Sequence, residues 1–254
     1  GIEFRANTAQ AEQLCSFLSV VYGEQIREGS GIGIKLASRF GSERIMRAAI
    51  NYAINNQKRS VCIVHKGNIM KCTEGAFRDW CYNLAKSEFK DKIVFESEIE
   101  KGIDPKERLI IKDRMTDLMF QELILKPEEF DVICCMNLNG DYLSDAASAQ
   151  VGGPSLAHSA NINYESKIAV FEPTHGPIHK YAGQNKVNPT SLLLSAVMML
   201  EYLGLQEAAD LIVYALEKTF LQRKVTFDFA RQMSGRELMS CSGFGKAVIS
   251  NMRK

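Results

Sequence analysis

Short β-branched runs alternate along this chain with segments whose apolar residues recur every three or four positions. Ser60–Val64 predicts a strand, and residues 130–136 predict another. Helical periodicity covers about residues 8–22, 42–57 and 73–88. Alternation of the two periods is typical of α/β architecture. We therefore expect an α/β fold.

The first two helices have recognisable limits. The helix over residues 8–22 is expected to end at Gly23, and the helix over residues 42–57 to begin at Ser42. The second helix is expected to bury Ile45, Ala49, Ile50, Ala53 and Ile54. Between the two helices, Gly29–Gly33 lacks the G-x-G-x-x-G spacing of a dinucleotide loop, so we interpret it as a turn into a strand.

The middle of the chain changes character. Ile93–Phe95 and Leu109–Ile111 flank a Gly-Ile-Asp-Pro turn, as in a β excursion or a long hairpin. A helix over about residues 113–125 follows, and a further helix opens near Asp141. The composition changes near residue 152, which is the best candidate for a domain boundary.

Beyond that point the sequence becomes looser and then helical again. Residues 152–190 are rich in Gly, Pro, Asn and His, and helices are expected at about 190–203 and 206–220.

Charge and cysteine usage exclude several classes of protein. The 254 residues carry 31 Lys and Arg against 30 Asp and Glu, so no basic field calls for nucleic acid or an anionic membrane. The longest apolar run, Ser191–Leu200, is too short to span a bilayer. Seven cysteines without a C-x-x-C pair indicate reduced thiols. We expect a cytoplasmic protein, with the mitochondrial matrix as the alternative.

Two carboxylate pairs suggest metal chemistry. Asp113 and Asp117 are four residues apart on the predicted helix, and Asp141 and Asp145 share that spacing, so each pair would project from one helix face. Oxygen ligands suit Mg²⁺ or Mn²⁺ better than zinc. The alternative is that Asp141 caps its helix and that the other carboxylates are solvated.

His65-Lys66-Gly67-Asn68 follows the predicted strand, which places Lys66 at the strand end where open α/β sheets carry ligands. A lysine there could donate or accept a proton, although an ordinary exposed lysine is the alternative. His175 and His179 are also four residues apart, but Gly176 and Pro177 prevent a helix between them. A loop that contacts a ligand, or a structural histidine, is the better interpretation.

Taken together, four segments resemble the metal-dependent, decarboxylating isocitrate dehydrogenases of bacterial type. They are VHKGNIMKCTEGAFRDW (64–80), MNLNGDYLSDAASAQVGG (136–153), FEPTHGPIHKYAGQNKVNP (171–189) and VTFDFARQM (225–233). The resemblance runs in order from Gly1 to Met252. It implies an isocitrate/isopropylmalate dehydrogenase-like fold of three parts: a clasp region and linker (1–41), a small α/β domain with metal and catalytic residues (42–152), and the C-terminal part of a large cofactor-binding domain (153–254).

The resemblance implies hydride transfer from isocitrate to NADP, followed by loss of carbon dioxide to give 2-oxoglutarate. Lys66 matches the catalytic lysine, and Asn68 matches a residue at the substrate and nicotinamide. Asp117, Asp141 and Asp145 match the aspartates that bind Mg²⁺ or Mn²⁺. The family lends Lys66 and Asp117 across a dimer interface, so the resemblance also implies a homodimer.

The cofactor residues lie late in the chain. His175 lies in the matching Thr-His-Gly segment, Asn188 matches an adenine-contacting asparagine, and Lys180, Tyr181 and Arg231 match groups that hold the 2′-phosphate. NADP is therefore favoured over NAD. Phe227 stands where NADP-preferring members have a tyrosine, and Pro177-Ile178-His179 replaces a Thr-Ala-Pro segment.

Members of the family carry an upstream segment with substrate-binding and catalytic residues that this sequence lacks, so we expect the chain alone to be a poor catalyst. One alternative is a catalytically incomplete relative that binds metal or nucleotide, or pairs with a full-length subunit. Another is a 3-isopropylmalate dehydrogenase-like enzyme, which Phe171-Glu172-Pro173 favours but Lys180-Tyr181 does not.

Overall fold

The computed structural model describes residues 2–252, which fall into two compact units. The first unit ends at Met136 and the second begins at Asn137. This division comes at the start of a helix whose other end, at residue 151, adjoins the composition change. The predicted three-part division of the chain stays a prediction.

The first unit is built on a four-stranded sheet in the order β4-β5-β3-β6, and every neighbouring pair is parallel. The strands are β3 (Ser60–His65), β4 (Ile93–Phe95), β5 (Leu109–Met115) and β6 (Val132–Cys135). Every residue of β3 is buried, as expected for a central strand covered on both faces. The expectation of an α/β fold is confirmed.

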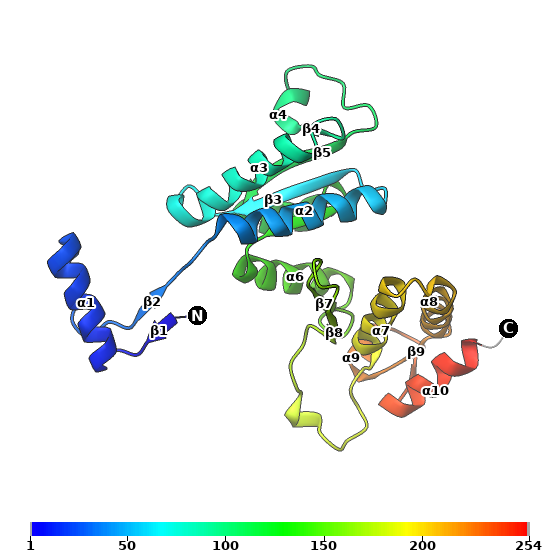
Figure 1. Ribbon diagram of the computed structural model, residues 1–254. Coiled ribbons are helices and arrows are strands. Elements are labelled where there is room, and N and C mark those ends of the chain that lie inside the picture. Colours follow the sequence, from blue (N-terminus) through cyan, green and yellow to red (C-terminus); the bar gives the residue numbers. More distant parts are fainter. Residues whose placement is uncertain (1, 253–254) are drawn as a thin grey trace. The chain divides into compact units, whose positions relative to one another are not determined.

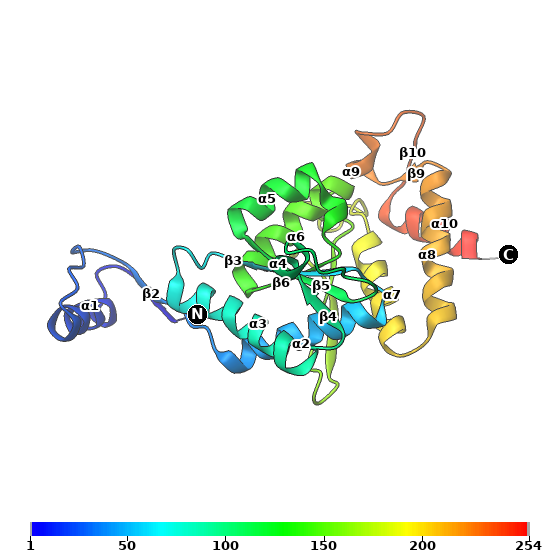
Figure 2. The same cartoon turned by 90° about the horizontal axis from the view of Figure 1, so that it is seen from above.

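Helices cover both faces of this sheet. They are α2 (Arg39–Asn55), α3 (Ala76–Glu88), α4 (Glu96–Ile99) and α5 (Thr116–Leu125), with a π-helical turn η1 (Lys71–Gly75) and a 3-10 turn η2 (Pro127–Glu129). Helices α2 and α3 pack on one face, and α5 lies on the other (Figure 2). The connections β3-α3-β4 and β5-α5-β6 advance in opposite directions along the sheet, so right-handed crossovers place their helices on opposite faces.

The core of this unit contains thiols as well as hydrocarbon. Met46, Ile50 and Phe77 are its largest members from the helices, and they are almost fully buried. Cys62, Cys81 and Cys134 are buried as well, and all seven cysteines of the chain are free thiols. Burial raises the pKa of the Cys62 thiol to about 12, and a hydrogen bond with Cys81 together with burial raises that of Cys134. These thiols therefore act as small apolar groups.

The N-terminal segment of this unit, which we call the clasp (residues 2–34), is a two-stranded antiparallel sheet with one helix. Strand β1 (Ile2–Phe4) pairs with β2 (Ile32–Ile34), and α1 (Ala9–Tyr22) lies between them in sequence. The Thr8 side chain caps α1, and Gly23 ends it at φ +72°, as predicted. Residues 35–38 then lead in an extended path to α2 (Figure 1).

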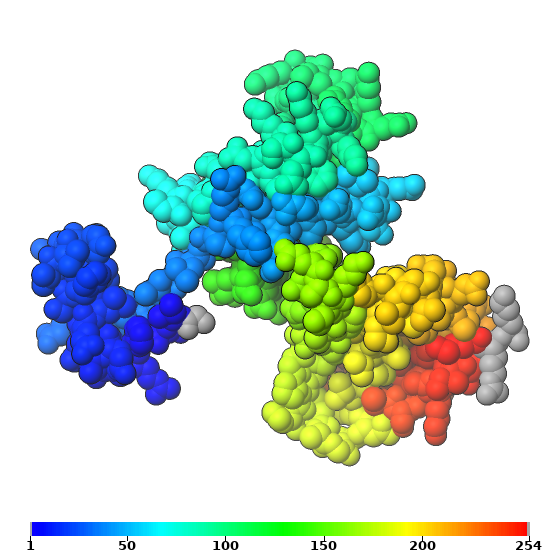
Figure 3. Space-filling view, viewed as in Figure 1, coloured from blue at the N-terminus to red at the C-terminus, as the bar shows by residue number. Residues whose placement is uncertain are grey.

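The second unit joins a β-hairpin to a group of helices. In chain order its elements are α6 (Asn137–Val151), β7 (His158–Ile162), β8 (Ala169–Pro173), η3 (His179–Tyr181), α7 (Thr190–Tyr202), α8 (Gln206–Leu221), β9 (Lys224–Val225), α9 (Phe227–Ala230), β10 (Glu237–Leu238) and α10 (Cys241–Met252). Helices α8 and α10 pack directly together through Ala215, Leu216, Phe244 and Val248 (Figure 3). The helices predicted over 190–203 and 206–220 are confirmed.

The sequence placed the start of α2 wrongly. The helix begins at Arg39 and is capped by Ser38, whose hydroxyl accepts from the Gly41 N–H at 3.1 Å. Ile45 is 44% exposed, whereas Met46 is fully buried. The four residues before Ser42 lack apolar periodicity, so only the cap marks this end of the helix.

Three further expectations fail. Strands β4 and β5 pair in parallel through α4, so they do not form a hairpin. Asp113 lies on β5 and Asp117 in the first turn of α5, so the two do not share a helix face. The stretch taken as loose, 152–190, contains the β7–β8 hairpin.

Among residues 2–252, no helix is long and apolar enough to cross a membrane.

Candidate active site

Lys66 and Asp117 meet at the carboxyl edge of the parallel sheet. Strands β3 and β5 are adjacent, with His65 opposite Met115, so the residues that follow them emerge side by side. Lys66 Nζ donates to Asp117 Oδ1 at 2.6 Å, and the two side chains are 32% and 58% exposed. This hydrogen bond lowers the pKa of Asp117. Asp117 also lies in the first turn of α5, where a helix favours negative charge.

Behind this pair, a buried histidine is fixed by a carboxylate and a phenol. His65 Nδ1 accepts from the Gly67 N–H at 3.0 Å, so the ring proton is on Nε2, which donates to Asp113 Oδ2 at 3.0 Å. The Tyr82 hydroxyl donates to Asp113 Oδ1 at 2.6 Å. The hydrogen bonds from His65 and Tyr82 lower the pKa of Asp113. Burial and the hydrogen bond to Asp113 raise the pKa of Tyr82. His65 is therefore held in one tautomer and orientation.

The loop that carries Lys66 is fixed from its other side by Glu74, which lies in η1 and is 1% exposed. Glu74 Oε2 accepts from the Lys66 backbone N–H at 3.1 Å, and Oε1 pairs with the ammonium of Lys35. Gly67 packs so closely against Gly75 that a Cβ on Gly67 would lie 2.8 Å from the Gly75 Cα. The position of Lys66 is thus set by the backbone around it. Single π-turns of this kind are frequent at functional sites.

Asn68, the predicted substrate residue, is exposed in the turn after Lys66. Its neighbours Ile69 and Met70 donate backbone N–H groups to the Lys66 carbonyl, at 3.2 and 2.9 Å, so the turn is ordered. Sequence reasoning missed Glu74 and Tyr82. Both lie on the helical segment after Lys66, and their value comes from contacts that no local pattern encodes.

Asp141 and Asp145 lie in the second and third turns of α6, where both are exposed. Residues four apart on a helix are neighbours on one face, about 5–6 Å apart at Cβ. Their oxygens are suitable ligands for Mg²⁺ or Mn²⁺, so the donor set fits such a metal. Within residues 2–252, however, no three or more His, Cys, Asp or Glu side chains are grouped closely enough to hold a metal ion. The predicted metal site stays a prediction.

The predicted phosphate-binding residues Lys180 and Tyr181 form η3, and they adjoin an aromatic and cationic cluster. The rings of Tyr181 and Phe227 lie 5.1 Å apart, and Lys186 Nζ lies 4.9 and 4.6 Å from their centroids. Lys180 Nζ is 5.6 Å from the Tyr181 ring. Cations beside aromatic faces fit a ligand that has phosphate and a planar ring. Sequence reasoning missed Lys186.

The remaining predicted cofactor residues have different surroundings. His175 Nε2 lies 2.8 Å from the Ser191 hydroxyl, and Arg231 is exposed directly after α9. Asn188 is buried: its amide donates to Asp228 Oδ2 at 3.0 Å, and its carbonyl oxygen accepts from Thr190. The contact of these residues with a cofactor stays a prediction.

Comparison with known proteins decides the family. A family model described as isocitrate/isopropylmalate dehydrogenase matches residues 11–248. The chain belongs to this dehydrogenase family. Its relatives include "Isocitrate dehydrogenase [NADP]" of Staphylococcus aureus strain Mu50, 48% identical over the whole chain, and the protein of the same name from Helicobacter pylori strain J99, 49% identical over 99% of the chain.

Two solved structures have a similar fold. Isocitrate dehydrogenase from Methylococcus capsulatus superposes over the whole chain with a TM-score of 0.80 at 29% identity, and TT0538 protein from Thermus thermophilus with 0.76 at 32%. The chain covers 64% of the Staphylococcus aureus relative, 60% of the Helicobacter pylori relative, and 63% and 43% of the two structures. It thus spans less than two thirds of the length of each.

Proposed function

We propose that this chain is the C-terminal part of an NADP-dependent isocitrate dehydrogenase, which oxidises isocitrate to 2-oxoglutarate and carbon dioxide while NADP is reduced. The observation that carries the proposal is identity of 48% along the whole chain to enzymes of that name. The Lys66–Asp117 pair at the carboxyl edge of the sheet gives the proposal a chemical centre. Because the chain spans 64% of such an enzyme, the activity belongs to the longer protein.

Lys66 is the proposed proton-transfer group. Its ammonium group donates to Asp117 Oδ1 at 2.6 Å in this arrangement. Proton exchange between Lys66 and the substrate would be general acid–base catalysis. The His65, Gly67 and Glu74 contacts keep the Lys66 backbone in place during this exchange.

The proposed metal ligands are Asp117, Asp141 and Asp145. A bound Mg²⁺ or Mn²⁺ would stabilise negative charge that develops on the substrate oxygens. Asp117 belongs to the first unit and the other two to the second, and all three carboxylates are exposed. We propose that Asp117, together with Lys66, completes the Asp141–Asp145 site of a second subunit, so that the active protein is a homodimer.

The proposed NADP site uses Lys180, Tyr181, Arg231, His175 and Asn188. NADP would supply the hydride acceptor. The Lys180 and Arg231 cations suit the 2′-phosphate, and Lys186 adds a third cation that faces Tyr181 and Phe227. The buried Asn188 holds the segment before α7 in place through Asp228 and Thr190.

Isocitrate-dependent reduction of NADP in the presence of Mn²⁺, followed by absorbance, tests the proposal. The natural full-length protein should be active with isocitrate, inactive with 3-isopropylmalate, and severely impaired by Lys66→Met. This chain alone should be a poor catalyst. Oxidation of 3-isopropylmalate in place of isocitrate would overturn the substrate assignment.

The second candidate function is pairing with a full-length subunit. Mixing the chain with a full-length relative and separating the mixture by size exclusion tests it. Co-elution at the mass of a mixed dimer supports pairing, and separate elution excludes it.

A further inference from the structure

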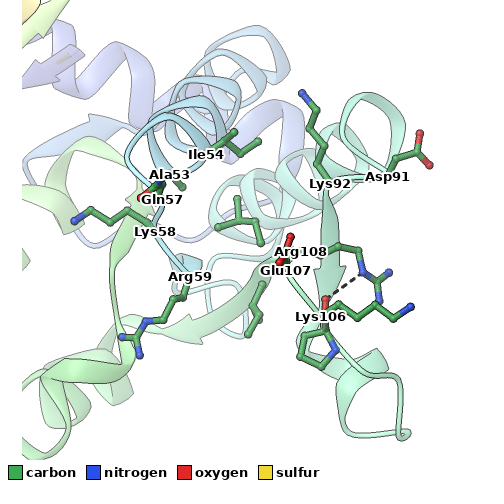
Figure 4. Close-up of a pocket in the computed structure, with 13 residues that line it drawn as sticks. Ala53, Ile54, Gln57, Lys58, Arg59, Asp91, Lys92, Lys106, Glu107 and Arg108 are labelled. Atoms are coloured by element: carbon green, nitrogen blue, oxygen red, sulfur yellow. Dashed lines mark hydrogen bonds between the residues drawn. The ribbon is translucent and has the colours of Figure 1, made fainter.

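A recess lies at one end of the four-stranded sheet, opposite the end that carries Lys66 and Asp117. It has a volume of about 840 Å³ and is formed where α2 ends and where strands β3, β4 and β5 begin (Figure 4). This volume lies within the range of small-molecule pockets, roughly 300–1,000 Å³. None of the residues proposed above for substrate, metal or NADP lines it.

The interior of the recess is apolar. Ala53 and Ile54 of α2 form one side, and Leu109 and Ile110 of β5 form another. Ala53 and Leu109 are buried, while Ile54 and Ile110 are half-buried, so the latter two present hydrocarbon to the recess. Pro105 adds a rigid apolar edge. Such an interior favours the hydrocarbon or planar part of a ligand.

The rim is cationic. Five basic residues line the recess against two acidic ones: Lys58, Arg59, Lys92, Lys106 and Arg108 against Asp91 and Glu107. Arg59 is neutralised by Asp131, to which it donates at 3.1 and 3.2 Å. Within residues 2–252, the ammonium groups of the three lysines form no hydrogen bond or ion pair. With Asp91 and Glu107 counted, the lining residues other than Arg59 carry a net charge of +2 beside an apolar interior.

One wall is fixed by its own hydrogen bonds. The Lys106 N–H donates to Asp104 Oδ1 at 2.9 Å, and the Arg108 guanidinium donates to the Asp104 carbonyl at 2.8 Å. The guanidinium also donates to the Pro105 carbonyl at 3.3 Å (Figure 4). Because backbone carbonyl groups are neutral, these hydrogen bonds do not neutralise the Arg108 guanidinium. The turn between α4 and β5 thus holds Arg108 and presents Lys106 beside the recess without a ligand.

We propose that this recess binds a small organic anion with an apolar or planar body and at least two negative charges. The interior would take up the body, and Lys58, Lys92, Lys106 and Arg108 would surround the anionic groups. A small molecule fits better than nucleic acid because the chain as a whole carries a net charge of only +1.

The test is a titration of the full chain, labelled with ¹³C at the isoleucine methyl groups. The probes are naphthalene-1,5-disulfonate, which has both features, and pyrophosphate, which has only charge. The disulfonate should shift the methyl signals of Ile54 and Ile110 and leave those of Ile63 and Ile212 unchanged. Pyrophosphate should bind at least roughly tenfold more weakly, since it cannot use the apolar interior.

A charge-reversed variant and a matched control complete the test. Lys58→Glu with Lys106→Glu should weaken disulfonate binding by roughly tenfold or more. Lys90→Glu with Lys101→Glu, which makes the same change in net charge on exposed residues outside the recess, should leave binding nearly unchanged. Absence of shifts at Ile54 and Ile110, equal binding of pyrophosphate, or equal weakening in the control would each overturn the proposal.

Discussion

At the residue scale, Tyr82 stabilises the carboxylate that orients His65. Tyr82→Phe removes one of two hydrogen bonds to Asp113, so the pKa of Asp113 should rise toward its ordinary value of about 3.9. We expect the free energy of unfolding at pH 7 to fall by about 1 kcal/mol, at the low end for a bond to a charged group, because Asp113 is 37% exposed.

The pH dependence has a definite sign. The folded-state pKa of Asp113 is lowered, so its contribution is complete above about pH 4 and is lost as the pH falls through the folded value. The difference between parent and Tyr82→Phe in urea unfolding should therefore shrink below pH 4. Tyr52→Phe, at an exposed tyrosine, is the control and should have little effect. A difference that is constant from pH 7 to pH 3 would contradict this role.

Asp141 tests whether the α6 carboxylates bind metal. Asp141→Asn removes one negative charge from an exposed pair that lies away from the core, so folding should be unchanged. We expect Mn²⁺ binding, measured by calorimetry, to be lost. Glu165→Gln, at an exposed hairpin turn, controls for the loss of surface charge. Unchanged metal affinity would mean that Asp141 is only a solvated side chain.

Lys180 tests the choice of nucleotide. Lys180→Ala should weaken NADP binding more than NAD binding, by roughly 1 kcal/mol or more, because only NADP has the 2′-phosphate. Fluorescence titration with both reduced nucleotides measures this. Lys167→Ala, at an exposed lysine in the connection between β7 and β8, is the control. Equal losses for both nucleotides would remove Lys180 from the phosphate site.

The sequence predicted some of the site residues and missed others for a physical reason. Lys66 follows a β-branched run, so its place at a strand end could be inferred from local pattern. Glu74, Tyr82 and Lys186 act through contacts with residues that are 8, 31 and 41 positions away in the chain, and no local periodicity reports such contacts.

At the element scale, Arg114 joins two helices to the sheet. From β5 it donates to both carboxylate oxygens of Glu96 in α4, at 2.7 and 2.9 Å, and to Glu122 in α5 at 2.9 Å. Arg114→Lys cannot reproduce this fork, so we expect a loss of about 1–3 kcal/mol in unfolding free energy. Hydrogen exchange should quicken in α4, which has only four residues.

Arg39→Lys is the matched control, because its pair with Glu43 is on the surface, with Arg39 71% exposed. It should change stability by less than about 0.5 kcal/mol. Equal effects of the two substitutions would show that Arg114 is no more than another surface cation.

Some helices and strands could be predicted from local sequence patterns, and others could not. Helix α1 was predicted with its glycine stop because its apolar spacing and Gly23 are local signals. For β4 and β5 the sequence left a β excursion and a long hairpin open, because two strands and a Gly-Ile-Asp-Pro turn fit either arrangement; only the hairpin is wrong. In the structure β5 lies between β4 and β3, and it pairs in parallel with both. Asp113 was predicted in a helix but lies in a strand, because β5 continues to Met115.

At the scale of the whole molecule, the clasp predicts self-association. Strands β1 and β2 form an isolated two-stranded sheet, which is marginally stable alone. Ile34 at the end of β2 is 42% exposed, and Leu36 just after it is 71% exposed. Light scattering should give twice the chain mass of 28.4 kDa. Leu36→Asp should shift the equilibrium toward the monomer, whereas Leu221→Asp, at a leucine that is 83% exposed, should not. A monomer at all concentrations would contradict the proposed homodimer.

The cysteines are distributed so that their chemical modification can report on the opening of each unit separately. Cys62, Cys81 and Cys134 are sealed in the core of the first unit, whereas the second unit has a single cysteine, Cys241, at the half-exposed start of α10. Reagents reach sealed thiols only when the surrounding structure opens. The order in which an alkylating agent modifies these four positions would therefore show which unit opens first, the one with the sheet or the helical one. No introduced label is needed.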